Sequence, residues 1–173
     1  LEKILTWLDR TLKVADFDDV SNNGLQVGRE QGTGNGEQVK AVAFAVDASV
    51  RAVEAAAKAG AQLLVVHHGI SWGGGMKRLT GGVGNVVRAA MKANLAICAY
   101  HLPLDAHPTL GNNAQLAKYF GLKKVRPAFS YHGNVIGVIG TNRHGKLIGI
   151  CSGGAGEFAE EAKNLGCDLY VTG

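Results

Sequence analysis

Two stretches of apolar residues end in histidines, and this placement is typical of metal chemistry. His67 and His68 follow the first stretch, and His101 follows the second, with Asp105 four residues further along the chain. A buried strand carries polar side chains only for a reason, because burying an unpaired polar group is unfavourable. Imidazole nitrogens and carboxylate oxygens are ligands of divalent metals. The pattern therefore predicts metal ligands gathered at one edge of a sheet.

His67 and His68 can serve one site only if the chain bends as it leaves the strand. Without such a bend, neighbouring residues of a strand point to opposite faces. Gly69 would allow that bend. The alternative is one histidine packed in the core and one in solvent. A second imidazole and a carboxylate after an equivalent strand favour the metal site over this alternative.

His101 and Asp105 each have more than one interpretation. His101 is the candidate catalytic residue, since it could orient a ligand or move a proton, and it could equally bind metal. Asp105 could be a terminal carboxylate ligand, or it could cap a turn near Pro103 and Pro108. The spacing alone leaves these alternatives open.

The elements around these residues alternate between strand and helix. Apolar runs predict strands, helical spacing of apolar residues predicts helices, and Ser49 is a suitable N-cap. Strand–helix–strand units at this spacing are parallel crossovers. In chain order the prediction is a helix over 1–14, a loop over 16–36 with a tip at 32–36, a strand over 41–46, a helix over 50–59, a strand over 62–67, a helix over 83–93, a strand over 95–100, and a helix capped by Asn112 or Asn113 and running to Tyr119.

The rest of the chain predicts a hairpin followed by one more helix and strand. The expected elements are a connector over 126–131, hairpin strands over 135–139 and 147–150, a helix over 158–164 and a strand over 168–171. The apolar runs before the histidines are continuous rather than alternating, which fits strands covered on both faces. The predicted fold class is therefore α/β, a layered sheet with parallel strand–helix–strand units and helices on its faces.

Length and composition indicate one soluble domain. Of the 173 residues, 46% are hydrophobic and 18% are charged, which suffices for one well-buried core. The net charge of +4 is mild, so nucleic acid is permitted as a partner but not indicated. No apolar stretch reaches the ~18 residues of a membrane span, so no membrane partner is expected. The three cysteines are an odd number within apolar segments and indicate a reduced, cytoplasmic protein.

The expected domain covers the whole chain. We predict one α/β domain over residues 1–173, with 123–146 as a variable connector within it. The chain begins at Leu1 rather than at an initiator Met, and it ends at Gly173 directly after a predicted buried strand. We therefore expect a fragment whose domain is incomplete at its C-terminal end.

A glycine-rich segment, Ser152–Gly156, lies between a predicted strand and a predicted helix. Its backbone N–H groups could hold an anion, although it lacks the lysine of a phosphate-binding loop. A turn that lets the strand and the helix pack closely is an equally compatible interpretation.

Four segments together resemble a known family. They are SNNGLQVG at 21–28, VVHHGISW at 65–72, YHLPLDAHPTLGNNAQLA at 100–117 and CSGGAGEF at 151–158. These segments resemble the NGG-interacting-factor-three-like family, whose bacterial members are often named GTP cyclohydrolase I type 2 homologues. The resemblance runs nearly from end to end and is weakest between Lys123 and Lys146.

The resemblance implies a two-layered α/β protein that forms a ring-shaped homo-hexamer with a dinuclear metal site in each subunit. By motif match, His67, His68 and Asp105 would be metal ligands, with His101 beside them. The family completes its site with a His and a Glu of a GHxxxE-type motif, which would follow the strand ending in TG and is outside this sequence. We therefore expect this chain to bind at most one metal ion, weakly, and the complete protein to bind two per subunit.

The leading functional prediction is a dinuclear divalent-metal-binding protein with hydrolase-type machinery for a small, nucleotide-like substrate. Two ions ~3.5 to 4 Å apart would polarise a substrate and activate a water. Imidazole and carboxylate donors suit Zn, Fe, Mn, Co or Ni without distinguishing among them. The alternatives are a non-enzymatic metal-handling or regulatory ring and, behind it, a basic ring threaded by nucleic acid.

Overall fold

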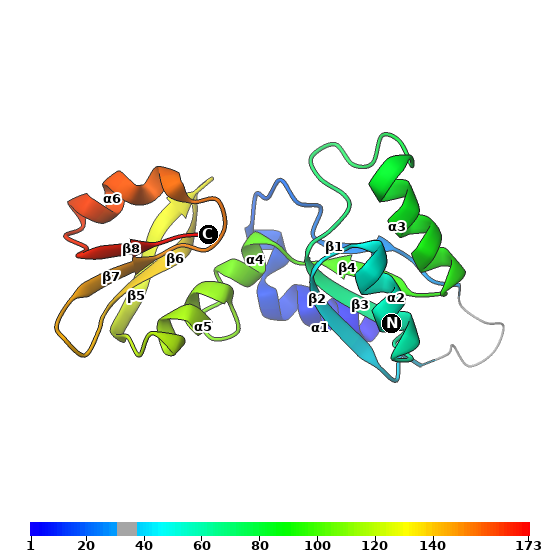
Figure 1. Cartoon of the computed structure of the whole chain (residues 1–173), viewed down its shortest axis with the longest axis horizontal. Helices are drawn as coiled ribbons and strands as arrows, with labels where there is room; N and C mark the ends of the chain where they lie inside the picture. The colour runs from blue at the N-terminus through cyan, green and yellow to red at the C-terminus, as the bar shows by residue number, and fades with distance from the viewer. Residues whose placement is uncertain (31–37) are drawn as a thin grey trace. The chain divides into compact units, whose positions relative to one another are not determined.

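Three parallel strands form the centre of the N-terminal part of the chain. The computed structural model describes residues 1–30 and 38–173 (Figure 1). The parallel strands are β2 (Val42–Asp47), β3 (Leu63–His68) and β4 (Ala96–Ala99), and the helices between them are α2 (Val50–Lys58) and α3 (Gly81–Lys92). Parallel neighbours need a crossover connection, and these two helices supply it. The predicted strand–helix–strand units are confirmed.

A fourth strand of this sheet was not predicted. Strand β1 (Gly24–Val27) pairs antiparallel with β4 and gives the order β1-β4-β3-β2, whereas the sequence predicts a loop over 16–36. The strand has four residues and begins directly after two asparagines of a turn, so the local pattern carries little strand signal. The tip predicted at 32–36 lies outside the described residues.

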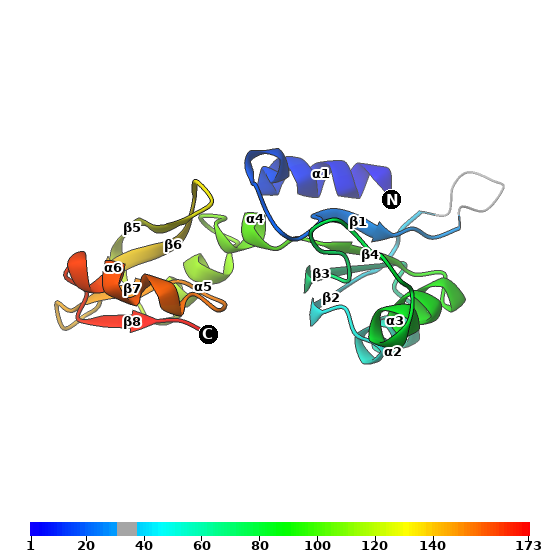
Figure 2. The ribbon, with the colours of Figure 1, turned by 90° about the horizontal axis from the view of Figure 1, so that it is seen from above.

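Helices cover both faces of the sheet. Helix α1 (Glu2–Leu12) lies over one face, and α2 and α3 lie over the other, as Figure 2 shows. A short 3-10 turn, η1 (Val14–Asp16), follows α1. The core beneath α2 and α3 combines helix residues such as Val53 and Val86 with strand residues such as Leu64 and Ile97. Each such side chain contributes roughly 1.5–3 kcal/mol when fully buried. The α/β fold class is confirmed.

Local capping agrees with the sequence at one helix and differs at another. The Ser49 side chain accepts a hydrogen bond from the Ala52 N–H at 3.1 Å, as expected for the N-cap of α2. Helix α5 (Asn112–Tyr119) instead has Gly111 as its N-cap, so the prediction of an asparagine cap is wrong. Gly111 packs against backbone carbonyl oxygens of the preceding turn, where a Cβ atom would collide. The asparagine amides are therefore available for other hydrogen bonds.

The described residues divide into two compact units, Leu1–His101 and Leu102–Gly173, whereas the sequence predicts one domain over 1–173 and gives no sign of this division. The second unit has its own sheet, in the order β5-β6-β7-β8. Its elements are α4 (Leu102–Asp105), α5, β5 (Lys123–Tyr131), β6 (Asn134–Thr141), β7 (Leu147–Ile150), η2 (Gly156–Phe158), α6 (Ala159–Asn164) and β8 (Leu169–Val171). The predicted hairpin of β6 and β7 and the final helix and strand are confirmed.

The connector predicted over 126–131 is wrong, because these residues belong to strand β5. This strand pairs antiparallel with β6 along most of its length, so the segment 123–146 carries two strands. Its charged start and Pro127 obscure the strand pattern, but proline is tolerated there because β5 is an edge strand. Strands β7 and β8 form the parallel pair of this mostly antiparallel sheet.

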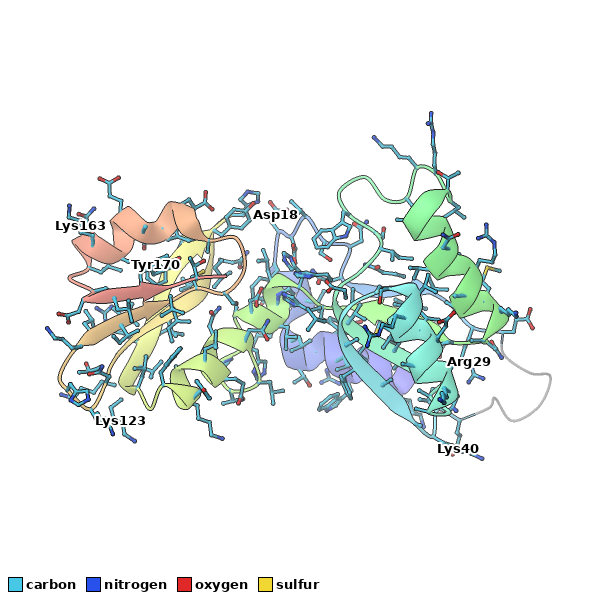
Figure 3. All side chains as sticks on the ribbon, in the orientation of Figure 1. Asp18, Arg29, Lys40, Lys123, Lys163 and Tyr170 are labelled. Carbon is cyan, nitrogen blue, oxygen red and sulfur yellow. The ribbon has the colours of Figure 1, made fainter. Side chains whose placement is uncertain are left out.

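Aromatic rings pack around the last strand of the second unit. Tyr170 on β8, labelled in Figure 3, meets Phe129 with ring centroids 5.2 Å apart in an edge-on arrangement. Its hydroxyl donates a 2.7 Å hydrogen bond to the Ala155 carbonyl. The strand and the loop before α6 are thereby tied together.

Every helix in the described ranges is too short or too polar to cross a membrane.

Candidate metal centre

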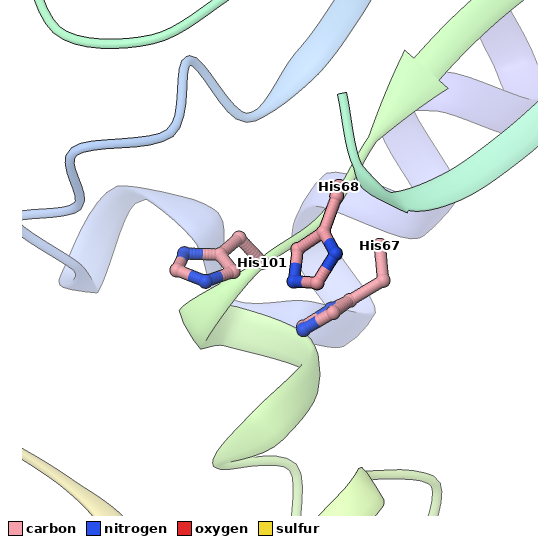
Figure 4. Close-up of side chains that lie close together, drawn as sticks. All are labelled: His67, His68 and His101. Carbon is pink, nitrogen blue, oxygen red and sulfur yellow. The ribbon is translucent and has the colours of Figure 1, made fainter. Parts of the chain in front are cut away.

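The carboxyl ends of parallel strands meet at one edge of the first sheet, and the three histidines of interest lie there. His67 and His68 end β3, and His101 follows β4. One ligand atom from each ring lies within 4.8 Å of those of the other two (Figure 4). The ring centroids of His67 and His68 are 4.5 Å apart, and those of His67 and His101 are 5.0 Å apart. The structure therefore brings together side chains from two neighbouring strands.

The adjacent histidines converge although they are consecutive in the chain. His68 is the last residue of the strand, and Gly69 comes directly after it, at the position where the sequence predicts a bend. Gly69 has a further role, since a Cβ atom there would collide with the Gln26 side chain and the Ala99 methyl group. The absence of a side chain lets the loop after β3 pack tightly against β1 and β4.

Each of the three imidazoles uses its Nδ1 atom for a hydrogen bond to an oxygen. Nδ1 of His67 lies 3.0 Å from the Tyr100 carbonyl oxygen. Nδ1 of His68 lies 2.8 Å from Asp47 Oδ1, and Nδ1 of His101 lies 2.9 Å from Asp19 Oδ1. Carbonyl and carboxylate oxygens only accept hydrogen bonds, so each Nδ1 carries the hydrogen. In the neutral ring, the lone pair that can bind a metal is then on Nε2.

This donor set fits a divalent metal ion. Metal-binding histidines usually donate their other ring N–H to a carboxylate or carbonyl oxygen, and all three imidazoles here do so. Nitrogens that share one tetrahedral ion at ~2.0–2.1 Å would be about 3.4 Å apart. The separation within 4.8 Å requires only small ring movements to reach that value. The cluster could therefore hold a metal.

An aromatic ring flanks the cluster. Trp72 lies in the loop after β3, and its ring meets that of His101 edge-on with centroids 5.2 Å apart. Its indole N–H donates a 3.0 Å hydrogen bond to the Gly69 carbonyl, which fixes the ring relative to the strand end. The ring is 37% exposed, so it is an apolar wall beside the histidines that solvent still reaches.

Asp105, the predicted carboxylate ligand, belongs to the second unit. It is buried, and its Oδ1 accepts hydrogen bonds from the Asn112 amide at 2.7 Å and from the Ser152 hydroxyl at 2.9 Å. These contacts give its carboxylate a defined orientation within that unit. Its role as a metal ligand stays a prediction, as does the catalytic role of His101.

Two carboxylates of the site were not identified from the sequence. Asp47 ends β2, and it is the register partner of His68 on β3. Asp19 lies in the loop between η1 and β1, where aspartates are common and carry no signal of their own. The end of a third predicted parallel strand could have indicated Asp47. Nothing in the local pattern could have indicated Asp19.

Two of the three cysteines, Cys98 and Cys151, are core residues. Burial raises the pKa of the Cys98 thiol to about 12, and a nearby carboxylate, Asp9, adds to this effect. Burial likewise raises the pKa of Cys151 to about 11. Both thiols are protonated near neutral pH, and thiols in that state are poor nucleophiles and poor metal ligands.

The glycine-rich segment Ser152–Gly156 is hydrogen-bonded to other parts of the second unit. The Ser152 N–H donates to the Asn113 side chain at 2.7 Å. The Gly153 carbonyl accepts from the Gly173 N–H at 3.1 Å and from the Thr172 hydroxyl at 2.9 Å. These bonds tie the segment to α5 and to the residues just after β8. A Cβ atom at Gly153, Gly154 or Gly156 would meet nothing within 4 Å, so these glycines are not required for close packing, and anion binding by the segment stays a prediction.

Comparisons with known proteins agree on one family. Residues 1–147 match the sequence profile of Duf34/NIF3 (NGG1p interacting factor 3). A Deinococcus radiodurans protein named GTP cyclohydrolase 1 type 2 homolog is 36% identical, and the alignment covers 99% of this chain and 73% of that protein. A Neisseria meningitidis serogroup B protein of the same name is 38% identical over 98% of this chain and 76% of its own length.

Solved structures have the same fold. The structure titled protein ybgI, unknown function, has a TM-score of 0.79 at 26% identity and covers 99% of this chain, which in turn covers 77% of ybgI. Reduced HcgD from Methanocaldococcus jannaschii has a TM-score of 0.80 at 19% identity, again with 99% of this chain and 77% of the other covered. At that identity, the second likeness concerns the fold alone.

Proposed function

Because this chain belongs to the Duf34/NIF3 family, we propose that it is a divalent-metal-binding protein with a hydrolase-type activity whose metal centre includes His67, His68 and His101. The relatives named GTP cyclohydrolase 1 type 2 homolog suggest a small, nucleotide-like substrate. The family resemblance adds Asp105 as a further ligand and a second ion. The same resemblance is the basis for proposing a homo-hexameric ring.

The observation that carries this proposal is that the three imidazoles share one hydrogen-bonding pattern. Each donates its Nδ1 hydrogen to an oxygen, so each presents a lone pair on Nε2. A single buried histidine would also pair its ring N–H, but three clustered rings that all carry the hydrogen on Nδ1 match the arrangement that metal-binding histidines adopt. The arrangement supports metal binding before any similarity to other proteins is considered.

The chain's own residues would prepare the site for catalysis. A bound divalent ion would supply Lewis-acid polarisation of an electrophile and a nucleophile at neutral pH. The hydrogen bonds to Nδ1 limit how far the imidazoles must reorganise, and Trp72 limits the access of water from one side. His68 is 43% exposed, which leaves the cluster open to a small substrate.

Metal analysis tests the proposal. The purified chain is dialysed to equilibrium against Zn²⁺ or Mn²⁺ and analysed for metal above the free concentration, beside His68→Ala and the control His144→Ala, which alters an exposed loop of the second unit. About one atom per chain supports a three-histidine centre and about two support a dinuclear one, with loss in His68→Ala and retention in His144→Ala. Less than about a tenth of an atom in the unaltered chain contradicts metal binding.

Substrate assays test the catalytic part separately. GTP and other nucleotides are incubated with metal-loaded chain and with His68→Ala, and the products are separated by chromatography. Metal-dependent conversion that His68→Ala lacks supports the hydrolase. A loaded chain that leaves every nucleotide unchanged contradicts the nucleotide-directed activity and leaves metal binding as a separate result.

The exposure of His68 also favours a second candidate function, metal handling without catalysis. A ligand that solvent reaches allows metal to exchange, as a carrier requires. Transfer of bound Zn²⁺ to a chromogenic chelator distinguishes the two candidates. Rapid transfer together with no hydrolysis supports handling, whereas slow transfer together with turnover supports catalysis.

A further inference from the structure

Asp19 is a buried carboxylate whose hydrogen bonds converge on His101. Its side chain is 1% exposed. Its Oδ1 accepts from the Ser21 N–H and from His101 Nδ1, both at 2.9 Å, and its Oδ2 accepts from the Asn23 amide at 2.9 Å. A carboxylate this deeply buried requires such partners, because its charge is otherwise poorly solvated. Asp19 is therefore part of a buried hydrogen-bond network rather than a solvent-exposed loop residue.

Asn23 holds His101 at a second point. Its side-chain oxygen accepts a 2.8 Å hydrogen bond from the His101 backbone N–H, while its amide donates to Asp19. Asn23 therefore hydrogen-bonds the main chain of His101, and Asp19 hydrogen-bonds its ring. Because Asn23 and Asp19 are also hydrogen-bonded to each other, the ring has little freedom to rotate.

The same segment holds the loop after His68. The Gln26 side-chain oxygen accepts from the Ile70 N–H at 2.7 Å and from the Ser71 N–H at 3.2 Å. The Asn22 amide donates to the Ser71 hydroxyl at 2.7 Å. The missing Cβ atom of Gly69 makes room for the Gln26 amide. Residues 19–26 therefore contact the chain just beyond both strands that carry the histidines.

We propose that Asp19 is a positioning residue of the metal centre, which fixes the His101 ring with its hydrogen on Nδ1 so that Nε2 serves as a metal ligand. This inference rests on the proposed metal site. It assigns His101 to metal binding rather than to proton transfer, and it gives the segment 19–26 the role of a scaffold. In this proposal Asp19 acts through His101.

The network explains why this position holds an aspartate rather than an asparagine. Both oxygens of Asp19 face N–H donors, so the site requires a side chain that only accepts. An asparagine would place its NH₂ group either against the Asn23 amide or against Ser21 N–H and His101 Nδ1. In the second orientation the ring must move its hydrogen to Nε2, where it blocks coordination.

The first test reads the histidine ring without metal. In ¹⁵N-labelled, metal-free chain at about pH 8, two-bond ¹H–¹⁵N correlations report which ring nitrogen carries the hydrogen. The expected result is hydrogen on Nδ1 of His101, with the resonance assigned by its loss in His101→Ala. Hydrogen on Nε2 of His101 in the unaltered chain overturns the proposal. The ring state itself is read in the unaltered sequence, and a variant serves only to assign the resonance.

The second test compares metal affinity between matched variants. Zn²⁺ affinity is measured by chelator competition in Asp19→Asn and in Asp168→Asn, which makes the same change at a carboxylate of the second unit that accepts hydrogen bonds from Lys146 and Leu147 rather than from a histidine. We expect Asp19→Asn to bind about 10- to 100-fold more weakly than the unaltered chain and Asp168→Asn to change affinity by less than about 3-fold. Equal affinity of Asp19→Asn and the unaltered chain overturns the proposal, provided that circular dichroism shows both to be folded.

The two tests separate this inference from the proposed function. A chain with the expected ring state that binds no metal overturns the metal site and leaves the fixing of His101 by Asp19 intact. A chain that binds metal with Nε2 of His101 protonated overturns the inference and leaves the metal site intact, held by other ligands.

Discussion

Two carboxylate–imidazole pairs lie at the same sheet edge and differ in burial rather than in geometry. Asp47 and His68 are 2.8 Å apart, and Asp19 and His101 are 2.9 Å apart. The side chains of the first pair are 67% and 43% exposed, whereas those of the second are 1% and 19% exposed. Water screens the exposed pair, so it contributes little to the free energy of folding. The Asp19 carboxylate is buried, where an unpaired charge is strongly unfavourable. The two pairs therefore contribute differently to stability although their distances are nearly equal.

The two pairs also arise from the chain in different ways. Asp47 faces His68 because β2 and β3 are in parallel register, so the pair follows directly from sheet formation. Asp19 reaches His101 across a sequence separation of 82 residues and only after the loop before β1 has closed. The exposed pair is thus a by-product of the fold, while the buried pair requires a dedicated loop.

The largest expected effect comes from removing the carboxylates. Asp19→Ala leaves three donors without their acceptor in a buried place and should lower the free energy of unfolding by about 3–5 kcal/mol. Asp47→Ala removes an exposed partner and should lower it by less than about 1 kcal/mol. Urea unfolding of the metal-free chain, followed by tryptophan emission, measures both, because Trp7 and Trp72 lie in the first unit. Equal losses in the two variants would contradict the distinction drawn from burial.

A smaller loss of stability is expected from displacing the loop after β3, whose Trp72 ring contacts the His101 ring. In Gly69→Ala the new methyl group collides with the Gln26 amide and with Ala99, which should cost about 1–3 kcal/mol through displacement of the loop after β3. Gly74→Ala in the same loop is the matched control, since a Cβ atom there meets nothing within 4 Å. The same urea titration measures both variants.

The outcome for Gly69→Ala also bears on the site. If the loop contributes to the burial of the Asp19–His101 pair, the variant should lose Zn²⁺ affinity along with stability. Loss of stability in Gly69→Ala without any loss of affinity would show that the loop and the histidine pair are independent. If Gly74→Ala is destabilised as well, the loop is sensitive to any added side chain. That result would contradict the specific role of Gly69 in making room for Gln26.

The parts of the fold that sequence reasoning recovers are those with local signals. Continuous apolar runs predict β3 and β4, and the Ser49 cap predicts where α2 begins. Strand β1 is too short to show a pattern, and Pro127 hides β5. The asparagine cap predicted for α5 fails because Gly111 lies against backbone carbonyl oxygens of the preceding turn, where a Cβ atom would collide. The conformation of the folded turn, rather than the capping preference of a residue type, decides where this helix begins.

The candidate site shows the same limit. His67, His68 and His101 could be identified because polar residues at the ends of apolar runs are conspicuous, and the structure brings them together. Their oxygen partners could not be identified from the same pattern. The Tyr100 carbonyl is a backbone atom with no sequence signal, and Asp19 is one of several aspartates in a polar loop. Ligands are thus easier to predict than the groups that orient them.

The smallest expected effect concerns salt, and it separates the two pairs most directly. Between about 0.05 M and about 1 M NaCl the screening length falls from above ~10 Å to ~3 Å, which weakens the electrostatic interactions of an exposed carboxylate more than those of a buried one. The stability difference between the unaltered chain and Asp47→Asn should therefore shrink toward zero from less than about 1 kcal/mol. The corresponding difference for Asp19→Asn should persist, because neutralising this carboxylate leaves a buried donor facing another donor whatever the salt concentration. Paired urea titrations at both salt concentrations measure these differences, and a parallel decline for both variants would mean that solvent reaches Asp19 as freely as it reaches Asp47.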